Sequence, residues 1–228
     1  MRLVEGGIGK LARTEAGDQP MDIDLQILEL VCSRLCHDLI SPIGAVGNGL
    51  ELMAEEADQE LLDDARRLVE DSSSRAAALL QLYRSAYGNA GNQPSFGVNE
   101  AVRLAKEALD VNRLTLKATV PGGVEWPAGY GKLVLNAILT VSEWLPRGGT
   151  LSLTAENDTG FQIAAEGQQA ACPKDAERLI RLDRAGIEVS AHNIQPYLTA
   201  FIAARQNYRL TAAQAAEGAA VLSVKRAA

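Results

Sequence analysis

Two long apolar stripes with helical spacing constrain the fold of this chain more than any other feature. Between Asp22 and Met53, apolar side chains recur in steps of three and four residues, as one face of a continuous helix requires. After a polar break at residues 55–58, a second run with the same spacing continues from Leu61 to Tyr83. The pattern predicts a helical hairpin over residues 21–90.

A hairpin of two helices cannot close a hydrophobic core by itself. The apolar stripes are too wide for the two helices to hide from water. Their main members are Leu28, Val31, Leu35, Val46 and Leu50 on the first helix, and Leu61, Leu68, Leu79 and Tyr83 on the second. We therefore predict a homodimer in which two hairpins form a four-helix bundle.

Both charge and pattern change after the Asn/Gly-rich stretch that ends at Pro94. Residues 21–90 contain 13 acidic residues against 5 arginines, whereas residues 91–228 are nearly neutral. Helical patterns alternate there with short apolar or β-branched runs, which predicts an α/β sandwich with one sheet and helices on one face. The predicted elements are helices near 98–110, 130–145, 174–183 and 193–206, and strands near 114–120, 150–156, 160–165, 208–213 and 219–225. The chain then divides into a flexible tail (1–20), the hairpin (21–90) and the sandwich (91–228).

Composition excludes several classes of function. The net charge is -7 and no basic cluster is present, which argues against a nucleic-acid partner. No apolar run reaches the roughly 20 residues of a membrane span, and the first residues do not resemble a signal peptide. Three cysteines are an odd number and too few for a disulfide framework. A cytoplasmic protein is therefore expected.

His37 stands in the middle of the first predicted helix, in the string Cys36-His37-Asp38-Leu39-Ile40-Ser41-Pro42. At roughly 100° per residue, its side chain points away from the apolar stripe. A lone histidine on a helix surface is usually only solvated. Asp38 changes that interpretation, because an adjacent carboxylate can keep one imidazole nitrogen protonated and leave the other as the nucleophile. The pair suits a phosphoryl acceptor.

Small and polar residues surround His37 on the same face of the helix and would leave room for another protein's catalytic pocket. The predicted partner-binding residues are Arg34, Ser41, Gly44 and Asn48. Arg34, one turn before His37, could pair with a phosphoryl group. Pro42 removes a backbone hydrogen bond inside the helix, at a cost of roughly 3 kcal/mol unless packing compensates.

The run SRLCHDLISPIGAVGNGLELM, which contains the His-Asp-Leu-x-x-Pro string, resembles two related phosphoacceptor sequences. One is the box of dimeric sensor histidine kinases, and the other is that of the ChpT-type histidine phosphotransferases of bacterial phosphorelays. The second resemblance extends from about Met21 over nearly the whole chain, since that family joins a dimerising hairpin to a domain shaped like the histidine-kinase ATPase (Bergerat) fold. It implies that His37 is phosphorylated, that Asp38 is its acid/base partner, and that Ser41 stands where related kinases place a residue that influences dephosphorylation.

The ATPase-like region departs from the pattern of active kinases. Asn136 matches the first asparagine of the kinase asparagine box, but the second, which helps to hold Mg²⁺, is replaced by Thr140. The expected Asp-x-Gly-x-Gly motif reads Ala165-Glu166-Gly167-Gln168-Gln169, and the segment 193–198 lacks a glycine-rich phosphate loop. We therefore expect a fold retained for packing and docking, without ATP chemistry and with no intrinsic cofactor.

The leading hypothesis is a histidine phosphotransferase. His37 would accept a phosphoryl group from the receiver domain of a hybrid histidine kinase and pass it to the receiver domain of a response regulator. The partner receiver domain would supply Mg²⁺, because phosphoryl transfer needs charge neutralisation and in-line positioning. The alternatives are an ATP-dependent sensor-type histidine kinase or phosphatase, and a dimeric adaptor that binds response regulators while His37 stays inert.

The remaining cysteines and the second histidine carry weaker signals. Cys32, Cys36 and His37 offer at most three metal ligands and do not point in one direction, so core or groove-lining thiols are the favoured interpretation. His192 has no neighbouring carboxylate and is expected in a loop or at a helix start.

Overall fold

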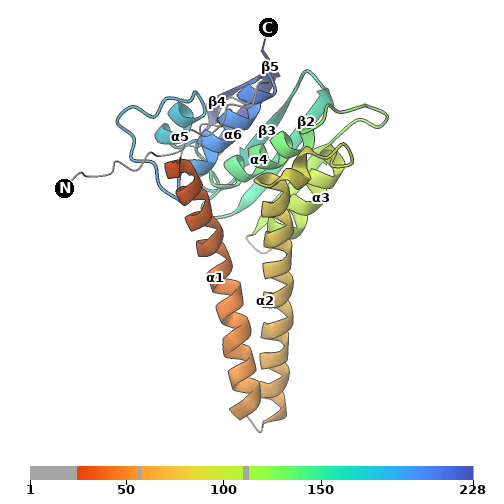
Figure 1. Ribbon diagram of the computed structural model, residues 1–228, viewed down its shortest axis with the longest axis vertical. Coiled ribbons are helices and arrows are strands. Elements are labelled where there is room, and N and C mark those ends of the chain that lie inside the picture. The colour runs from red at the N-terminus through yellow and green to blue at the C-terminus, as the bar shows by residue number, and fades with distance from the viewer. Residues whose placement is uncertain (1–24, 56–57, 110–112, 228) are drawn as a thin grey trace, which may run out of the picture.

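The computed structural model describes residues 25–55, 58–109 and 113–227. A long helical hairpin projects from a domain in which helices pack against a single sheet (Figure 1). The hairpin consists of α1 (Leu25–Glu55) and α2 (Gln59–Ala86). The other helical elements are η1 (Asn89–Asn92), α3 (Val98–Leu109), α4 (Tyr130–Ser142), α5 (Lys174–Leu179) and α6 (Ile194–Arg205). The predicted tail at residues 1–20 lies outside the described residues.

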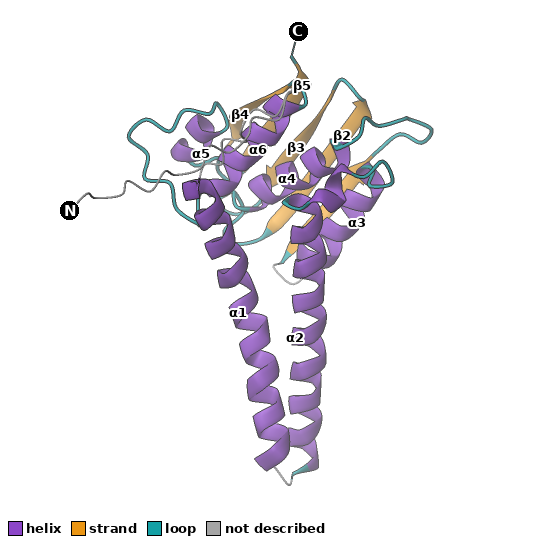
Figure 2. Cartoon of the chain, viewed as in Figure 1, coloured by secondary structure: helices purple, strands orange, loops and turns teal. Residues whose placement is uncertain are grey.

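The sheet has five strands in the order β1-β2-β3-β5-β4. Its strands are β1 (Leu114–Thr119), β2 (Gly149–Asn157), β3 (Gly160–Glu166), β4 (Tyr208–Ala216) and β5 (Ala219–Arg226). Only β1 and β2 are parallel, and the other pairs are antiparallel. Figure 2 shows α3, α4 and α6 gathered on one side of the sheet. The fold class predicted for the second half of the chain, an α/β sandwich with helices on one face, is confirmed.

The core of the sandwich lies between the sheet and α4, whose residues from Tyr130 to Val141 are all buried. The alternating buried positions of β3 face this helix, as a sheet with one covered face requires. Gly148 and Gly149 lead from α4 into β2 with φ angles of 81° and 145°. A Cβ atom on Gly149 would stand 2.3 Å from the Glu166 carbonyl oxygen, so only glycine fits this turn.

The apolar stripe on the hairpin differs from the prediction in part. Pro42 and Gly49 are the buried positions of α1, and a Cβ on Gly49 would lie 2.6 Å from Val69 Cγ2, so the two helices approach closely there. Leu28 and Leu50, in contrast, are about half exposed. Leu28 and Leu50 therefore lie on the predicted apolar face without being covered, because periodicity alone does not show which apolar positions meet the neighbouring helix.

The end of α2 is built into the sandwich rather than separated from it. Leu82, Tyr83 and Ala86 belong to the same hydrophobic core as the sheet, and Leu35 of α1 packs against that core. Lys132 and Asn136, one turn apart on α4, donate to carbonyl oxygens at the end of α2 and just after it: Asn136 Nδ2 to Ala86 (2.9 Å) and Lys132 Nζ to Gly88 (2.9 Å). These side chains satisfy carbonyl groups that a helix end leaves without partners.

A buried polar seam continues from that junction into α6. Gln195 Nε2 donates to Asn136 Oδ1 (3.1 Å), and Tyr87 Oη donates to Gln195 Oε1 (2.5 Å). Thr140 and Thr199 complete the seam, with their hydroxyl oxygens 2.7 Å apart. Because every one of these groups finds a partner, the hairpin is held in one position on the sandwich.

An ion pair makes a second attachment between the two parts. The Arg34 guanidinium on α1 lies 2.6 Å from the Glu143 carboxylate at the end of α4, and both side chains are largely buried. Burial raises the pKa of Glu143 to about 7, although Arg34 opposes the shift.

Within the described residues, none of the helices has the length and apolarity to cross a membrane.

The ion pair predicts a pH-dependent loss of stability in the Arg34→Met variant. Without Arg34, the folded-state pKa of Glu143 moves further above its usual 4.5. The unfolded chain then ionises Glu143 more readily than the folded chain does, so raising the pH destabilises the variant more than the wild type. The variant should be less stable than the wild type by about 1–3 kcal/mol at pH 8, and the difference should shrink towards pH 6. Urea unfolding at both pH values measures it. A second variant, Arg34→Met with Glu143→Gln, should lack the pH dependence, and an equal loss at both pH values would contradict this account.

Candidate active site around His37

His37 borders a cleft of about 500 Å³ between the hairpin and the sandwich. The cleft brings residues of α1 and α2 together with the ends of α3 and α4. Its polar lining residues are Arg34, His37, Asp38, Ser41, Arg75, Tyr83, Ser142 and Glu143. The phosphoacceptor candidate therefore stands at a junction of both parts of the chain, and not on an isolated helix.

The side chains of His37 and Asp38 contact each other directly. His37 Nδ1 lies 3.1 Å from Asp38 Oδ1, and the histidine side chain is 69% exposed. When Nδ1 is protonated and donates to this carboxylate, Nε2 keeps its lone pair. The geometry thus provides an oriented imidazole whose free nitrogen is accessible to another protein.

Tyr83 of α2 holds the second oxygen of the same carboxylate. Its hydroxyl donates to Asp38 Oδ2, and the ring stacks on Tyr87 with centroids 5.4 Å apart. Burial, together with the hydrogen bond to Asp38, raises the pKa of Tyr83 well above its usual range, so the phenol stays a donor. From the sequence, Tyr83 was predicted only as a member of the apolar stripe. The available signal was a tyrosine at a position where an aliphatic residue would serve a purely apolar contact.

Arg34 lines the cleft but already has partners. Its Nη2 pairs with Glu143, and its Nη1 donates to the Ala191 carbonyl oxygen at 3.4 Å. The predicted role of binding a phosphoryl group competes with these contacts. These two contacts of Arg34 could not be predicted from the sequence, because Glu143 and Ala191 are more than 100 positions away in the chain.

The other predicted partner-binding residues occupy two different environments. Ser41 lines the cleft with His37, whereas Gly44 and Asn48 lie further along α1 and outside it. Both are exposed, and a Cβ on Gly44 would meet nothing within 4 Å. These two positions therefore offer open helix surface towards the hairpin tip.

His192 was expected in a loop or at a helix start, and it lies in the turn before α6. Its ring contacts that of His37, with centroids 5.4 Å apart and planes at 83°. Nothing in the local sequence around His192 signals this contact, which arises from the packing of the sandwich against α1.

The cysteines do not form a site. Cys32 and Cys36 are exposed on α1, so the expectation of core or groove-lining thiols is wrong for them. Cys172 is half buried, and burial raises the pKa of its thiol to about 11. Across the described ranges, no three His, Cys, Asp or Glu side chains are grouped so that they could hold a metal ion.

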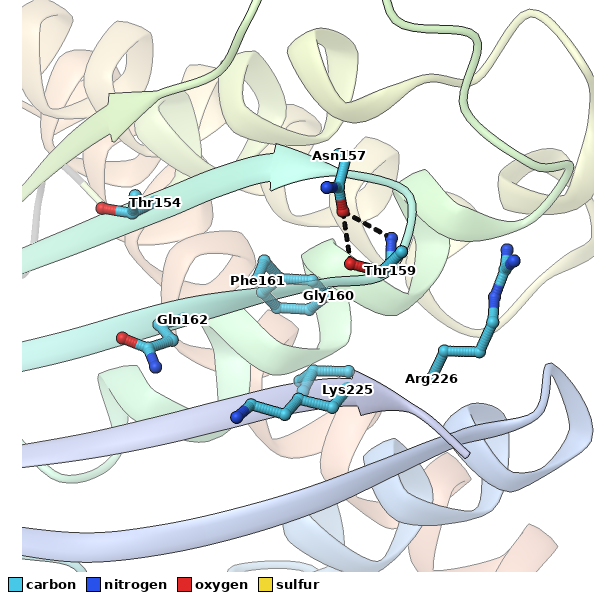
Figure 3. Close-up of a pocket in the computed structure, with 9 residues that line it drawn as sticks. Thr154, Asn157, Thr159, Gly160, Phe161, Gln162, Lys225 and Arg226 are labelled. Carbon is cyan, nitrogen blue, oxygen red and sulfur yellow. Dashed lines mark hydrogen bonds between the residues drawn. The ribbon is translucent and has the colours of Figure 1, made fainter. Parts of the chain in front are cut away.

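A separate hollow of about 490 Å³ lies over the sheet where β2 and β3 meet. Figure 3 shows Asn157 bonded to Thr159 in the turn, with Gln162 and Lys225 on the neighbouring strands. The hollow shares no residue with the His37 cleft. It contains neither a histidine nor a cysteine, so the chemistry predicted from the sequence is concentrated at the hairpin junction.

Comparisons with known proteins agree on one family. The model of the histidine phosphotransferase C-terminal domain matches residues 98–218. The protein phosphotransferase ChpT of Brucella abortus (strain 2308) is 33% identical over 198 residues, which cover 85% of this chain and 92% of that protein. A bacterial phosphotransferase solved at 1.7 Å superposes with a TM-score of 0.74 at 33% identity, covering 89% of this chain and 97% of that one. With its hairpin and sandwich as described above, the chain belongs to the ChpT-type histidine phosphotransferases.

Proposed function

We propose that His37 carries the phosphoryl group of a phosphorelay between receiver domains. The observation that carries this assignment is the imidazole in the cleft, with Nδ1 directed at Asp38 and Nε2 left open. A donor receiver, such as that of a hybrid histidine kinase, would present an aspartyl phosphate. An acceptor receiver of a response regulator would present a free aspartate.

The transfer step follows from this arrangement. Nε2 attacks phosphorus, a P–N bond forms, and the P–O bond to the donor aspartate breaks with its electron pair leaving on the carboxylate. The positive charge that develops on the imidazole is stabilised through Nδ1–H by the Asp38 carboxylate. Transfer to the second receiver is the reverse, with the electron pair of the P–N bond returning to Nε2.

Most of the charge neutralisation in this step is assigned to the receiver domain. Phosphoryl transfer depends mainly on in-line positioning and on cations near the equatorial oxygens. Arg34 is engaged by Glu143, so we assign the Mg²⁺ ion to the receiver and keep Arg34 as a secondary contact. We place this chemistry in the cytoplasm, where response-regulator receivers act.

We propose further that the sandwich has lost ATP chemistry. Both amide hydrogens of Asn136 are used, by the carbonyl oxygens of Ala86 and Lys132, and its oxygen accepts from Gln195. An asparagine side chain binds a magnesium ion only through its oxygen, and in Asn136 that oxygen already accepts a hydrogen bond. Asn136 is fully buried, so using it for metal would first break the seam that holds α2.

The test of the relay is labelling by a phosphorylated receiver. Wild-type protein should take up acid-labile phosphate from such a receiver, and MgATP alone should give none. The His37→Gln variant should take up none while keeping the melting temperature of the wild type, because the side chain is exposed. Label from MgATP would favour the kinase alternative, and receiver binding without any label would favour the adaptor.

Removing the charge of Asp38 should slow transfer in both directions. Asp38→Asn keeps the size of the side chain but loses the charge that stabilises a protonated Nδ1, and we expect a rate about 100-fold lower. Tyr83→Phe removes one hydrogen bond to the same carboxylate and should lower the rate by about tenfold. Single-turnover transfer measures both. Wild-type rates in the Asp38→Asn variant would remove Asp38 from the mechanism.

We also propose that the hairpin dimerises into a four-helix bundle. Nine large apolar side chains of the hairpin are between 39% and 69% exposed: Leu25, Leu28, Ile40, Ile43, Leu50, Leu52, Leu61, Leu68 and Leu80. Each fully buried aliphatic side chain is worth about 1.5–3 kcal/mol, so leaving this set in water is costly. We propose that the hairpin of a second copy of this chain covers these side chains, as the amphipathic helices predict. Leu35 was predicted on the same apolar stripe as Leu50, but it packs against the sandwich core and is not part of the exposed hairpin surface.

Charged substitutions on the hairpin should therefore dissociate the dimer. Leu50→Asp and Leu68→Asp should each shift the protein to the mass of a monomer in sedimentation equilibrium at micromolar concentration. Leu182→Asp is the matched control, because Leu182 is 41% exposed on the sandwich, outside the hairpin. Sedimentation of the wild type as a monomer would refute the bundle.

A further inference from the structure

The His37 ring is in contact with a residue from the other end of the chain. His192 lies in the turn that leads into α6, and its ring meets that of His37 edge to face, with centroids 5.4 Å apart and an angle of 83° between the planes. This is the separation and geometry that aromatic pairs prefer. The phosphoacceptor candidate is therefore held by two side chains, Asp38 on its own helix and His192 on the sandwich.

The turn that carries His192 is braced from both sides. Asn193 Oδ1 accepts the backbone N–H of Ser190 (2.7 Å), and Asn193 Nδ2 donates to the Glu188 carbonyl oxygen (3.1 Å). From α1, Arg34 Nη1 donates to the Ala191 carbonyl oxygen (3.4 Å). Arg34 and Ala191 are thus linked next to the pair that His37 and His192 form. The contact between the rings rests on a turn with defined backbone partners.

We infer that His192 is a positioning residue that fixes the tilt of the His37 ring for phosphoryl transfer. This inference rests on the proposed role of His37. The hydrogen bond to Asp38 fixes the direction of Nδ1, but an exposed imidazole bonded at one atom can still swing about that contact. The edge-to-face contact restricts this second motion, so that Nε2 keeps one direction towards the incoming phosphorus.

The consequence is kinetic. In-line transfer requires the attacking nitrogen to be aligned with the leaving oxygen, and loss of alignment lowers the rate without weakening the encounter of the two proteins. The same alignment is needed when the phosphoryl group arrives and when it leaves. Loss of the His192 ring should therefore slow both directions equally. An uncharged aromatic ring of similar size should serve nearly as well as histidine.

The experiment compares His192→Ala with His192→Phe in the full-length protein, with a phosphorylated receiver as donor. Varying the receiver concentration separates the maximal transfer rate from the half-saturating concentration. We expect His192→Ala to lower the maximal rate by about tenfold in both directions with an unchanged half-saturating concentration, and His192→Phe to restore it to within about twofold. Glu188→Ala is the control, because its side chain is exposed in the same loop and only its backbone takes part in the brace.

The outcomes separate the two proposals. A wild-type rate in His192→Ala, or equal slowing in the Ala and Phe variants, overturns the positioning role. A raised half-saturating concentration with an unchanged maximal rate also overturns it, because His192 would then contact the receiver. Wild-type protein that takes up no label refutes the role of His37 itself, whereas labelled wild type beside an unaffected His192→Ala variant refutes only the inference about His192. Relaxation of the His37 ring ¹³Cε1 signal gives an independent measure, and it should report greater ring motion in His192→Ala than in His192→Phe.

Discussion

The architecture depends on how the last turn of α2 is fixed to the sandwich. Asn136 donates to the carbonyl oxygen of its last residue, Lys132 donates to the Gly88 carbonyl oxygen just after it, and Gln195 binds Asn136 from α6. These hydrogen bonds are buried, where an unpaired polar group would be costly, so the hairpin has one favourable position. That attachment sets the position of His37, which lies on α1 and meets α2 and the turn before α6.

The buried seam includes two positions of the segment that resembles the kinase asparagine box, Asn136 and Thr140. Asn136, which matches the first asparagine of that box, donates to the Ala86 carbonyl oxygen and so caps a helix of the hairpin. The replacement of the second asparagine by Thr140 has a structural counterpart, because its hydroxyl is paired with that of Thr199. Asn136 and Thr140 thus contribute to holding the hairpin and the sandwich together.

The His37 site is assembled from three segments that are distant in the sequence. Asp38 orients one nitrogen, Tyr83 holds the carboxylate, and His192 contacts the ring. Tyr83 stacks on Tyr87, which donates a hydrogen bond to Gln195, so the candidate site around His37 is continuous with the buried seam. A rigid support of this kind suits a reaction whose protein contribution is mainly positioning.

Helical spacing, strand alternation and a contiguous motif are local properties, so they were enough to predict the helices and strands, the α/β sandwich, the family and the His37-Asp38 pair. The folded chain was needed to show that Leu35 faces the sandwich, that Arg34 pairs with Glu143, and that Tyr83 and His192 reach the site. The contacts of Tyr83, Glu143 and His192 with α1 join residues 45 to 155 positions apart. They depend on how the helices settle against the sheet, which periodicity cannot specify, since it gives the face of a helix but not the neighbour which that face will meet.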